Sequence, residues 1–149
     1  MASNVTEIYE RIRIPPLYWN DSIKDMPDKP YKALIQDWVN NIKSKIAIGK
    51  GLYLYGDFGM GKSSSAAILL RAAAARGIFG LWVDFRHIAE YHIDGTRFDE
   101  QETYFQRMSN VPILVIDEFE AKANKHYQID VVENIVRIRR HANRPTIIT

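Results

Sequence analysis

The sequence predicts a doubly wound α/β fold, in which a parallel sheet carries helices on both faces. Two apolar runs are the first indication: residues 52–55 precede a glycine-rich loop, and residues 111–116 precede two acids. The second indication is that strand-like and helix-like segments alternate along the chain, which is typical of parallel sheets. The 149 residues are enough for one domain with a substantial core.

The first part of the chain contains a linker and a helix. Residues 1–13 show no clear pattern, and we treat them as an N-terminal extension. Two prolines at 15 and 16 then predict an extended linker, because proline disfavours helical backbone in the residue before it. Asp28 and Pro30 mark the start of a helix whose apolar residues recur at helical spacing as far as Ile46. Two glycines, at 49 and 51, end it.

The remaining elements alternate. The first strand is followed by an alanine- and leucine-rich helix from Lys62 to Arg76, with Gly77 as its C-terminal cap. A second strand covers residues 79–84, residues 86–91 have helical potential, and a further helix covers residues 98–107. The third strand ends at Asp117, an amphipathic helix spans residues 129–142, and residues 145–149 begin a fourth strand.

The most informative motif is the segment GDFGMGKS at residues 56–63, a complete G-x-x-x-x-G-K-S phosphate loop between a strand and a helix. Such a loop directs backbone N–H groups and the positive end of the helix dipole at a phosphate. Lys62 is placed to reach the β- and γ-phosphates, and the Ser63 hydroxyl is placed to bind Mg²⁺. The predicted nucleotide-binding residues of the loop are Gly56, Asp57, Phe58, Gly59, Met60, Gly61, Lys62, Ser63 and Ser64.

A second motif supports the first. Asp117 and Glu118 close an apolar, β-branched run that resembles a buried parallel strand. Ligands of open α/β sheets bind at the carboxyl ends of the strands, so Asp117 should arrive beside the phosphate loop and hold Mg²⁺. Glu118 would orient and activate the attacking water, and Lys62 would complete a minimal set for phosphoryl transfer.

The composition argues against disulfide-containing, cysteine-metal and membrane-spanning proteins. The chain has no cysteine, which excludes disulfides and cysteine metal sites. No apolar run approaches the roughly 20 residues that span a bilayer, and the polar first ten residues do not resemble a signal peptide, so we expect a cytoplasmic protein without a membrane partner. The net charge is only +2, but residues 121–149 hold six basic and two acidic side chains. Such a cluster suits nucleic acid, although solvated helix charge is its more common explanation.

In the order of its motifs the chain resembles the AAA+ ATPase module of the DnaC/DnaI/IstB family, which contains bacterial and phage replicative helicase loaders and a transposition helper ATPase. The resemblance covers residues 14–149. It is carried by the linker IPPLY at 14–18, the phosphate loop, the strand and acids LVIDE at 114–118, and the segments 132–140 and 144–149.

The resemblance implies an ATPase that binds ATP or ADP with Mg²⁺, self-associates through the ATPase module, and contacts a replicative DNA helicase and single-stranded DNA. It implies catalytic roles for Lys62 and Glu118, metal contacts from Ser63 and Asp117, and Tyr18 and Ile23 near the adenine. The DNA contacts it implies are Arg86, His87, Arg97, Lys122 and Lys125.

The resemblance also implies what the module lacks. In the family the fourth strand continues into a Ser/Thr-Asn pair that senses the γ-phosphate, and a fifth strand, an arginine finger and a lid follow. We therefore expect residues 14–149 to be an AAA+ core truncated after the fourth core strand, with the lid absent and with weak or no ATP hydrolysis. Arg140 and Arg144 precede the family's position for the arginine finger.

Two other functions remain open from the sequence. A transposition helper ATPase of the IstB type has the same motifs. A phosphate-loop nucleotide kinase also fits the loop, although a kinase does not need Glu118 beside the metal-binding aspartate.

Overall fold

Four parallel strands form the centre of the computed structural model, which describes residues 2–88, 100–119 and 126–149. They are β1 (Leu52–Tyr53), β2 (Gly80–Asp84), β3 (Ile113–Asp117) and β4 (Thr146–Ile148). Their order across the sheet is β1-β4-β3-β2. In this register Asp84 lies opposite Asp117, and Ile116 lies opposite Ile148. The strand that carries the acid pair is therefore flanked on both sides.

Helices precede and connect the strands. The described helices are α1 (Ala2–Arg11), α2 (Pro30–Asn40), α3 (Ile42–Ala47), α4 (Lys62–Ala74), α6 (Glu100–Asn110) and α7 (His126–His141). Two short 3₁₀ turns, Pro16–Tyr18 and Ile23–Asp25, lie in the linker between α1 and α2. A helical turn covers residues 85–88. The predicted alternation of strands and helices is confirmed.

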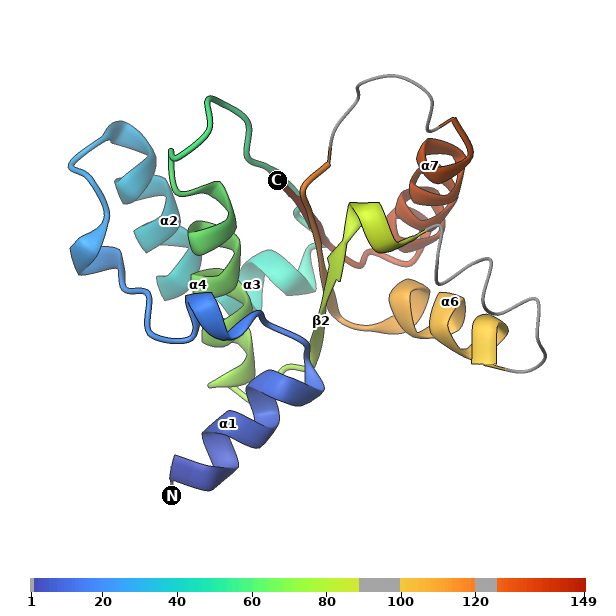
Figure 1. Ribbon diagram of the computed structural model, residues 1–149, viewed down its shortest axis with the longest axis horizontal. Helices are drawn as coiled ribbons and strands as arrows, with labels where there is room; N and C mark the ends of the chain where they lie inside the picture. The colour runs from blue at the N-terminus through green and yellow to red at the C-terminus, as the bar shows by residue number, and fades with distance from the viewer. Residues whose placement is uncertain (1, 89–99, 120–125) are drawn as a thin grey trace.

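The helices cover both faces of the sheet (Figure 1). On one face, α2, α3 and α4 pack against Trp82, Val115 and Ile147. On the other face, α6 and α7 pack against Leu81 and Leu114. Successive strand residues therefore enter opposite cores, which explains why β2 and β3 are apolar along their length. The doubly wound α/β prediction is correct.

The N-terminal extension differs from the prediction, because residues 2–11 form a helix where the sequence showed no pattern. An isolated helix of this length is marginal in water. Here it is stabilised by docking: the Arg71 Nε of α4 donates to the Tyr9 hydroxyl at 3.2 Å, and the Tyr9 ring lies 6.0 Å from that of Trp19. Just after the helix, the Ile12 carbonyl accepts a hydrogen bond from the backbone N–H of Trp82 at 2.8 Å, which covers the outer edge of β2.

The helix predicted up to Ile46 is divided in two. Asn41 leaves the helical region with φ −114° and ψ 22°, and its side-chain amide donates to the Asp37 carbonyl at 3.0 Å. The change of direction brings Gly49 against the backbone of Asn143, where an added Cβ would lie 2.9 Å away. Glycine is required there both for space and for its φ of +68°.

None of the described helices is long and apolar enough to cross a membrane.

Candidate functional site

The phosphate loop joins β1 to α4 in the predicted way. Gly59 and Gly61 both have φ +80°, a left-handed conformation that other residues rarely adopt. Gly61 is the N-cap residue of α4 and supplies no side chain to cap the first turn. The first N–H groups of the helix are therefore free of side-chain competition, at the end of the helix that attracts anions.

Lys62 lies folded against this loop. Its ammonium donates to the backbone carbonyls of Gly56 at 2.7 Å and Asp57 at 2.9 Å. Both acceptors are neutral, so an anionic phosphate oxygen would be a stronger partner for the same cation. The lysine is thus held at the loop by contacts that a phosphate can replace.

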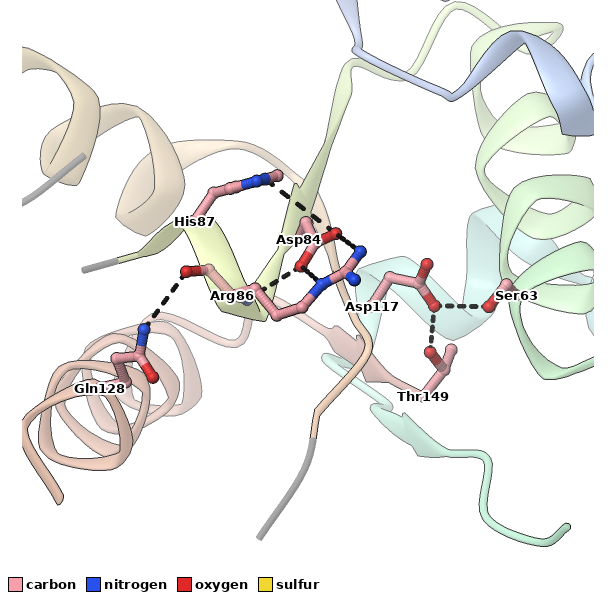
Figure 2. Close-up of polar contacts among 7 residues, drawn as sticks. All are labelled: Ser63, Asp84, Arg86, His87, Asp117, Gln128 and Thr149. Carbon is pink, nitrogen blue, oxygen red and sulfur yellow. Dashed lines mark hydrogen bonds and ion pairs between the residues drawn. The ribbon is translucent and has the colours of Figure 1, made fainter. Parts of the chain in front are cut away.

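Asp117 meets the loop through a shared hydrogen-bond network (Figure 2). The Oδ1 of Asp117 accepts a hydrogen bond from the Ser63 hydroxyl at 2.6 Å, and the same oxygen accepts one from the Thr149 hydroxyl. Asp117 is buried, and a buried carboxylate needs hydrogen-bond donors in place of water, which these two hydroxyls supply. Thr149 is a site residue that the sequence analysis did not identify. It follows β4, which neighbours β3, and that strand adjacency is visible only in the fold.

Glu118 turns the chain sharply after β3. Its φ of +59° lies in the left-handed region, and this conformation is unfavourable in free energy for any residue that carries a side chain. The next residue fixes the turn, because the Phe119 N–H donates to the Thr149 carbonyl at 2.8 Å. The strained backbone directs the chain along the site and not away from it, and strain of this kind is concentrated at functional positions.

These groups surround one cavity of about 730 Å³, a size suited to a nucleotide. Loop residues, both acids and several aromatic side chains form its wall. The lining residues are Tyr18, Tyr53, Leu54, Tyr55, Gly56, Phe58, Gly59, Met60, Gly61, Lys62, Ser63, Ser64, Asp117, Glu118, Phe119 and Thr149. Of the loop residues predicted to bind nucleotide, Asp57 alone is outside this set, and it contributes its carbonyl to Lys62.

The two residues expected near the adenine take different positions. Tyr18 lines the main cavity together with Ser63 and the acid pair. Ile23 is half-buried and packs against the core that α2, α3 and α4 share with the sheet. Its neighbours Ser22 and Asp25 line a second hollow of about 240 Å³, which also touches Gly61 and Ser64 at the start of α4.

The residues expected to contact DNA are only partly described. Arg97, Lys122 and Lys125 lie outside the described residues. Arg86 forms a bidentate ion pair with Asp84, with Nη2–Oδ2 at 2.6 Å and Nε–Oδ1 at 3.1 Å, and Nδ1 of His87 is 4.0 Å from Oδ2 of the same carboxylate. The side-chain amide of Gln128 on α7 donates to the Arg86 carbonyl at 3.2 Å (Figure 2).

Asp84 links this ion pair to the nucleotide site. It ends β2 directly opposite Asp117, so three carboxylates, including Glu118, lie at one edge of the sheet. The hydrogen bond and charge of Asp84 raise the pKa of Arg86, and Glu118 and Asp117 add to the effect. Burial raises the pKa of Asp84, but the hydrogen bonds and charge of Arg86 outweigh it and hold that pKa below its usual value. An acid at the end of the second strand was the sequence signal that could have identified Asp84.

Oxygen donors suited to Mg²⁺ are present in the site. Ser63 and Asp117 are in contact, and hydroxyl and carboxylate oxygens are the ligands that Mg²⁺ uses when it also binds phosphates. Among the described residues no cluster of three or more histidine, cysteine or acidic side chains forms a closed metal site. This donor set fits a cation held jointly by protein and phosphate, because Mg²⁺ rarely uses an all-protein cage.

Comparison with solved structures identifies the architecture. The DnaC helicase loader matches with a TM-score of 0.79 and 24% identity over 91% of this chain and 78% of that one. DnaI matches with a TM-score of 0.73 and 24% identity over 91% and 74% of the two chains. The fold is that of a DnaC/DnaI-like AAA+ module. The replication initiator DnaA bound to AMPPCP and single-stranded DNA matches this module with a TM-score of 0.73, 13% identity, and coverage of 91% and 42%.

Sequence comparison adds no family assignment to this AAA+ fold. A scan against protein-family models found no match, and a search of curated proteins found none either. The AAA+ architecture of the chain therefore rests on its structure and on the motifs that its own residues form.

Proposed function

We propose that this AAA+ module binds ATP with Mg²⁺ and hydrolyses it as the ATPase core of a replicative helicase loader. The observation that carries the proposal is the contact of Ser63 with Asp117 on the wall of one cavity that Lys62 and Glu118 also line. The phosphate-loop serine, the strand-end aspartate and the loop lysine are the groups that phosphoryl transfer requires. The AMPPCP-bound DnaA neighbour supports a nucleotide as the ligand.

Each residue has a role that its chemistry allows. The N–H groups at the start of α4 and the Lys62 ammonium bind the phosphates. Ser63 and Asp117 would hold Mg²⁺, which would neutralise phosphate charge when bound. Glu118 orients a water molecule and accepts its proton. We place the base toward the hollow beside residues 21–27, since that hollow adjoins the loop at Gly61 and Ser64.

Hydrolysis by a single chain should be slow. Of the described residues that line the main cavity, Lys62 is the one basic side chain. Charge that develops on the transferred phosphoryl group is commonly stabilised by a further arginine, which can come from a neighbouring subunit. We infer that self-association completes the site, so that ATP hydrolysis depends on assembly.

Binding to the helicase and to single-stranded DNA completes the proposed function. DnaC is a helicase loader, and the DnaA neighbour is bound to single-stranded DNA. Arg86 and His87 stay proposed DNA contacts, although a DNA phosphate would have to compete with the Asp84 carboxylate for Arg86. Arg97, Lys122 and Lys125 stay proposed on the sequence resemblance alone. A transposition helper ATPase shares the same site, so the identity of the co-purifying partner, a hexameric helicase or a transposase, separates the two.

Substitution of the two key residues tests the nucleotide site. Lys62→Ala should abolish binding of ATP and ADP, whereas Glu118→Gln should retain binding and lose hydrolysis. The matched control is Lys43→Ala, which removes an exposed lysine of α3. Titration of a fluorescent ATP analogue measures binding, and phosphate release measures hydrolysis. Equal loss of binding in both site variants would contradict the role of Glu118, and phosphate transfer to a nucleoside instead of water would favour a kinase.

A further inference from the structure

The linker between α1 and α2 is bound to α4 beside the nucleotide site. Arg71, on the outer part of α4, donates from Nη1 to the carbonyls of Asp21 at 2.6 Å and Tyr18 at 3.3 Å. The indole N–H of Trp19 donates to the Ile14 carbonyl at 2.7 Å. The Arg71 bonds attach the linker to the helix that begins at the phosphate loop, and the Trp19 bond fixes the linker internally, so the position of the linker backbone is coupled to that of the loop.

One linker side chain extends from this anchored backbone into the cavity. The Tyr18 ring packs on Trp82 of β2, with centroids 5.7 Å apart and planes inclined by 33°. Tyr18 lines the cavity together with Ser63, Asp117 and Glu118. A side chain fixed by ring packing and a tethered backbone loses little further entropy when its hydroxyl binds a ligand.

The surroundings of the Tyr18 hydroxyl are those of the phosphate end of the site. Burial raises the pKa of Tyr18, a hydrogen bond with the Ser63 side chain lowers it, and the charges of Asp117, Glu118 and Asp21 raise it. A phenol is protonated at neutral pH in any case and can donate one hydrogen bond. The same residues that influence it, Ser63 and the acid pair, are those proposed above to act on the terminal phosphate.

We propose that the Tyr18 hydroxyl donates a hydrogen bond to the terminal phosphate of the bound nucleoside triphosphate, so that the linker responds to the presence of that phosphate. The inference rests on the proposed function, because it requires a nucleotide in the cavity. It assigns Tyr18 to the phosphate end and not to the base. The consequence is that ATP and ADP differ in how tightly they fix residues 12–25.

The first test is Tyr18→Phe, which removes the hydroxyl and keeps the ring on Trp82. The affinity for ATP with Mg²⁺ should fall about tenfold, the typical effect of losing a hydrogen bond to a charged group. The affinity for ADP should stay within about twofold of the unchanged protein. The matched control is Tyr9→Phe, which removes a hydroxyl that also contacts Arg71 but lies outside the cavity lining. Tyr9→Phe should leave both affinities unchanged.

The second test follows the linker itself by amide hydrogen exchange. Backbone amides of residues 12–25 should exchange more slowly with ATP than with ADP in the unchanged protein, and this difference should disappear in Tyr18→Phe. Circular dichroism melts of the variants show whether each is folded. If Tyr18→Phe fails to fold, the unchanged protein still tests the inference, because equal exchange of residues 12–25 with ATP and with ADP overturns it.

The outcomes separate this inference from the proposed function. If the unchanged protein binds neither ATP nor ADP, the proposed function fails and the role of Tyr18 fails with it. If Lys62→Ala abolishes binding while Tyr18→Phe binds both nucleotides normally, only the role of Tyr18 is overturned. An equal loss of ATP and ADP affinity in Tyr18→Phe also overturns it, because the contact would then not be to the terminal phosphate.

Discussion

Arg139 of α7 is the buried group whose removal has the clearest expected cost. It is fully buried, and its guanidinium donates to the carbonyls of Met108 and Val111 at 2.8 and 2.7 Å, and of Pro145 at 2.7 Å. Its Nε donates to the Thr146 hydroxyl at 3.0 Å. One side chain thus connects the end of α6 with the starts of β3 and β4, the two strands that carry Asp117 and Thr149 to the site.

The substitution Arg139→Met should destabilise the fold strongly. Methionine keeps most of the volume, so the cost comes from polar groups and not from a cavity. Each buried acceptor left without its donor costs about 1–3 kcal/mol. Part of that loss is offset, because the variant no longer has to bury a cation. Burial, with a smaller effect of the Arg144 charge, lowers the pKa of Arg139 to about 9. Four neutral acceptors lose a donor, and after the offset from no longer burying the cation the expected net loss is about 3–5 kcal/mol.

The assay is equilibrium unfolding by heat and by urea, followed by circular dichroism. For a domain of this size a loss of 3–5 kcal/mol should lower the Tm by roughly 10 °C. The control is Arg140→Met, the adjacent exposed arginine, which should change stability by less than about 0.5 kcal/mol. If Arg139→Met unfolds within about 1 kcal/mol of Arg140→Met, the carbonyl network does not stabilise the fold and the reasoning is refuted.

Three further predictions concern the sheet and the site. Gly80→Ala should cost about 1–3 kcal/mol in urea unfolding, because the new Cβ would lie 2.3 Å from the Leu70 Cδ1. Asp84→Asn should make the free energy of unfolding depend less steeply on pH in acid. Folding lowers the Asp84 pKa, so the carboxylate stabilises the fold above pH 3.8, and this contribution is lost as the pH falls through the pKa of the folded state. Thr149→Val should weaken nucleotide binding about threefold to tenfold with Mg²⁺ and little without it, because Asp117 loses a donor.

Each of these predictions has a result that contradicts it. Unchanged urea stability in Gly80→Ala would mean that the Leu70 side chain moves at no cost. An acid limb in Asp84→Asn as steep as that of the unchanged protein would show that Arg86 does not stabilise the carboxylate. For Thr149→Val, an equal loss of affinity with and without Mg²⁺ would place its effect on the loop and not on Asp117.

The phosphate loop and the strands were predictable because their signals are local. Glycines that adopt φ +80° at 59 and 61, and a lysine and serine directly after them, specify the loop through backbone conformation alone. The apolar run of β3 specifies a strand buried on both faces, and the sheet confirms it. The helix α4 ends at Ala74, two residues before the predicted Arg76, and Gly77 closes the following turn with φ +74° and its N–H bonded to the Ala74 carbonyl.

Other features could not be predicted because their causes are distant in the sequence. The helix α1 is too short to be stable alone and depends on contacts with α4. The sequence gives no sign that Arg139, rather than Arg140, is the arginine enclosed by carbonyls. The division between α2 and α3 at Asn41 allows Gly49 to approach Asn143, nearly a hundred residues later.

The amino-acid sequence by itself determined that the chain has a phosphate loop, an acid pair and alternating strands and helices, because these depend on backbone conformation and hydrophobic periodicity over a few residues. The tertiary structure decided which side chains meet at the site. Thr149 reaches Asp117 because β4 lies between β1 and β3, and Tyr18 reaches the cavity because Arg71 and Trp82 hold the linker. Strand order and long-range packing determine these side-chain contacts, and neither can be read from a few neighbouring residues.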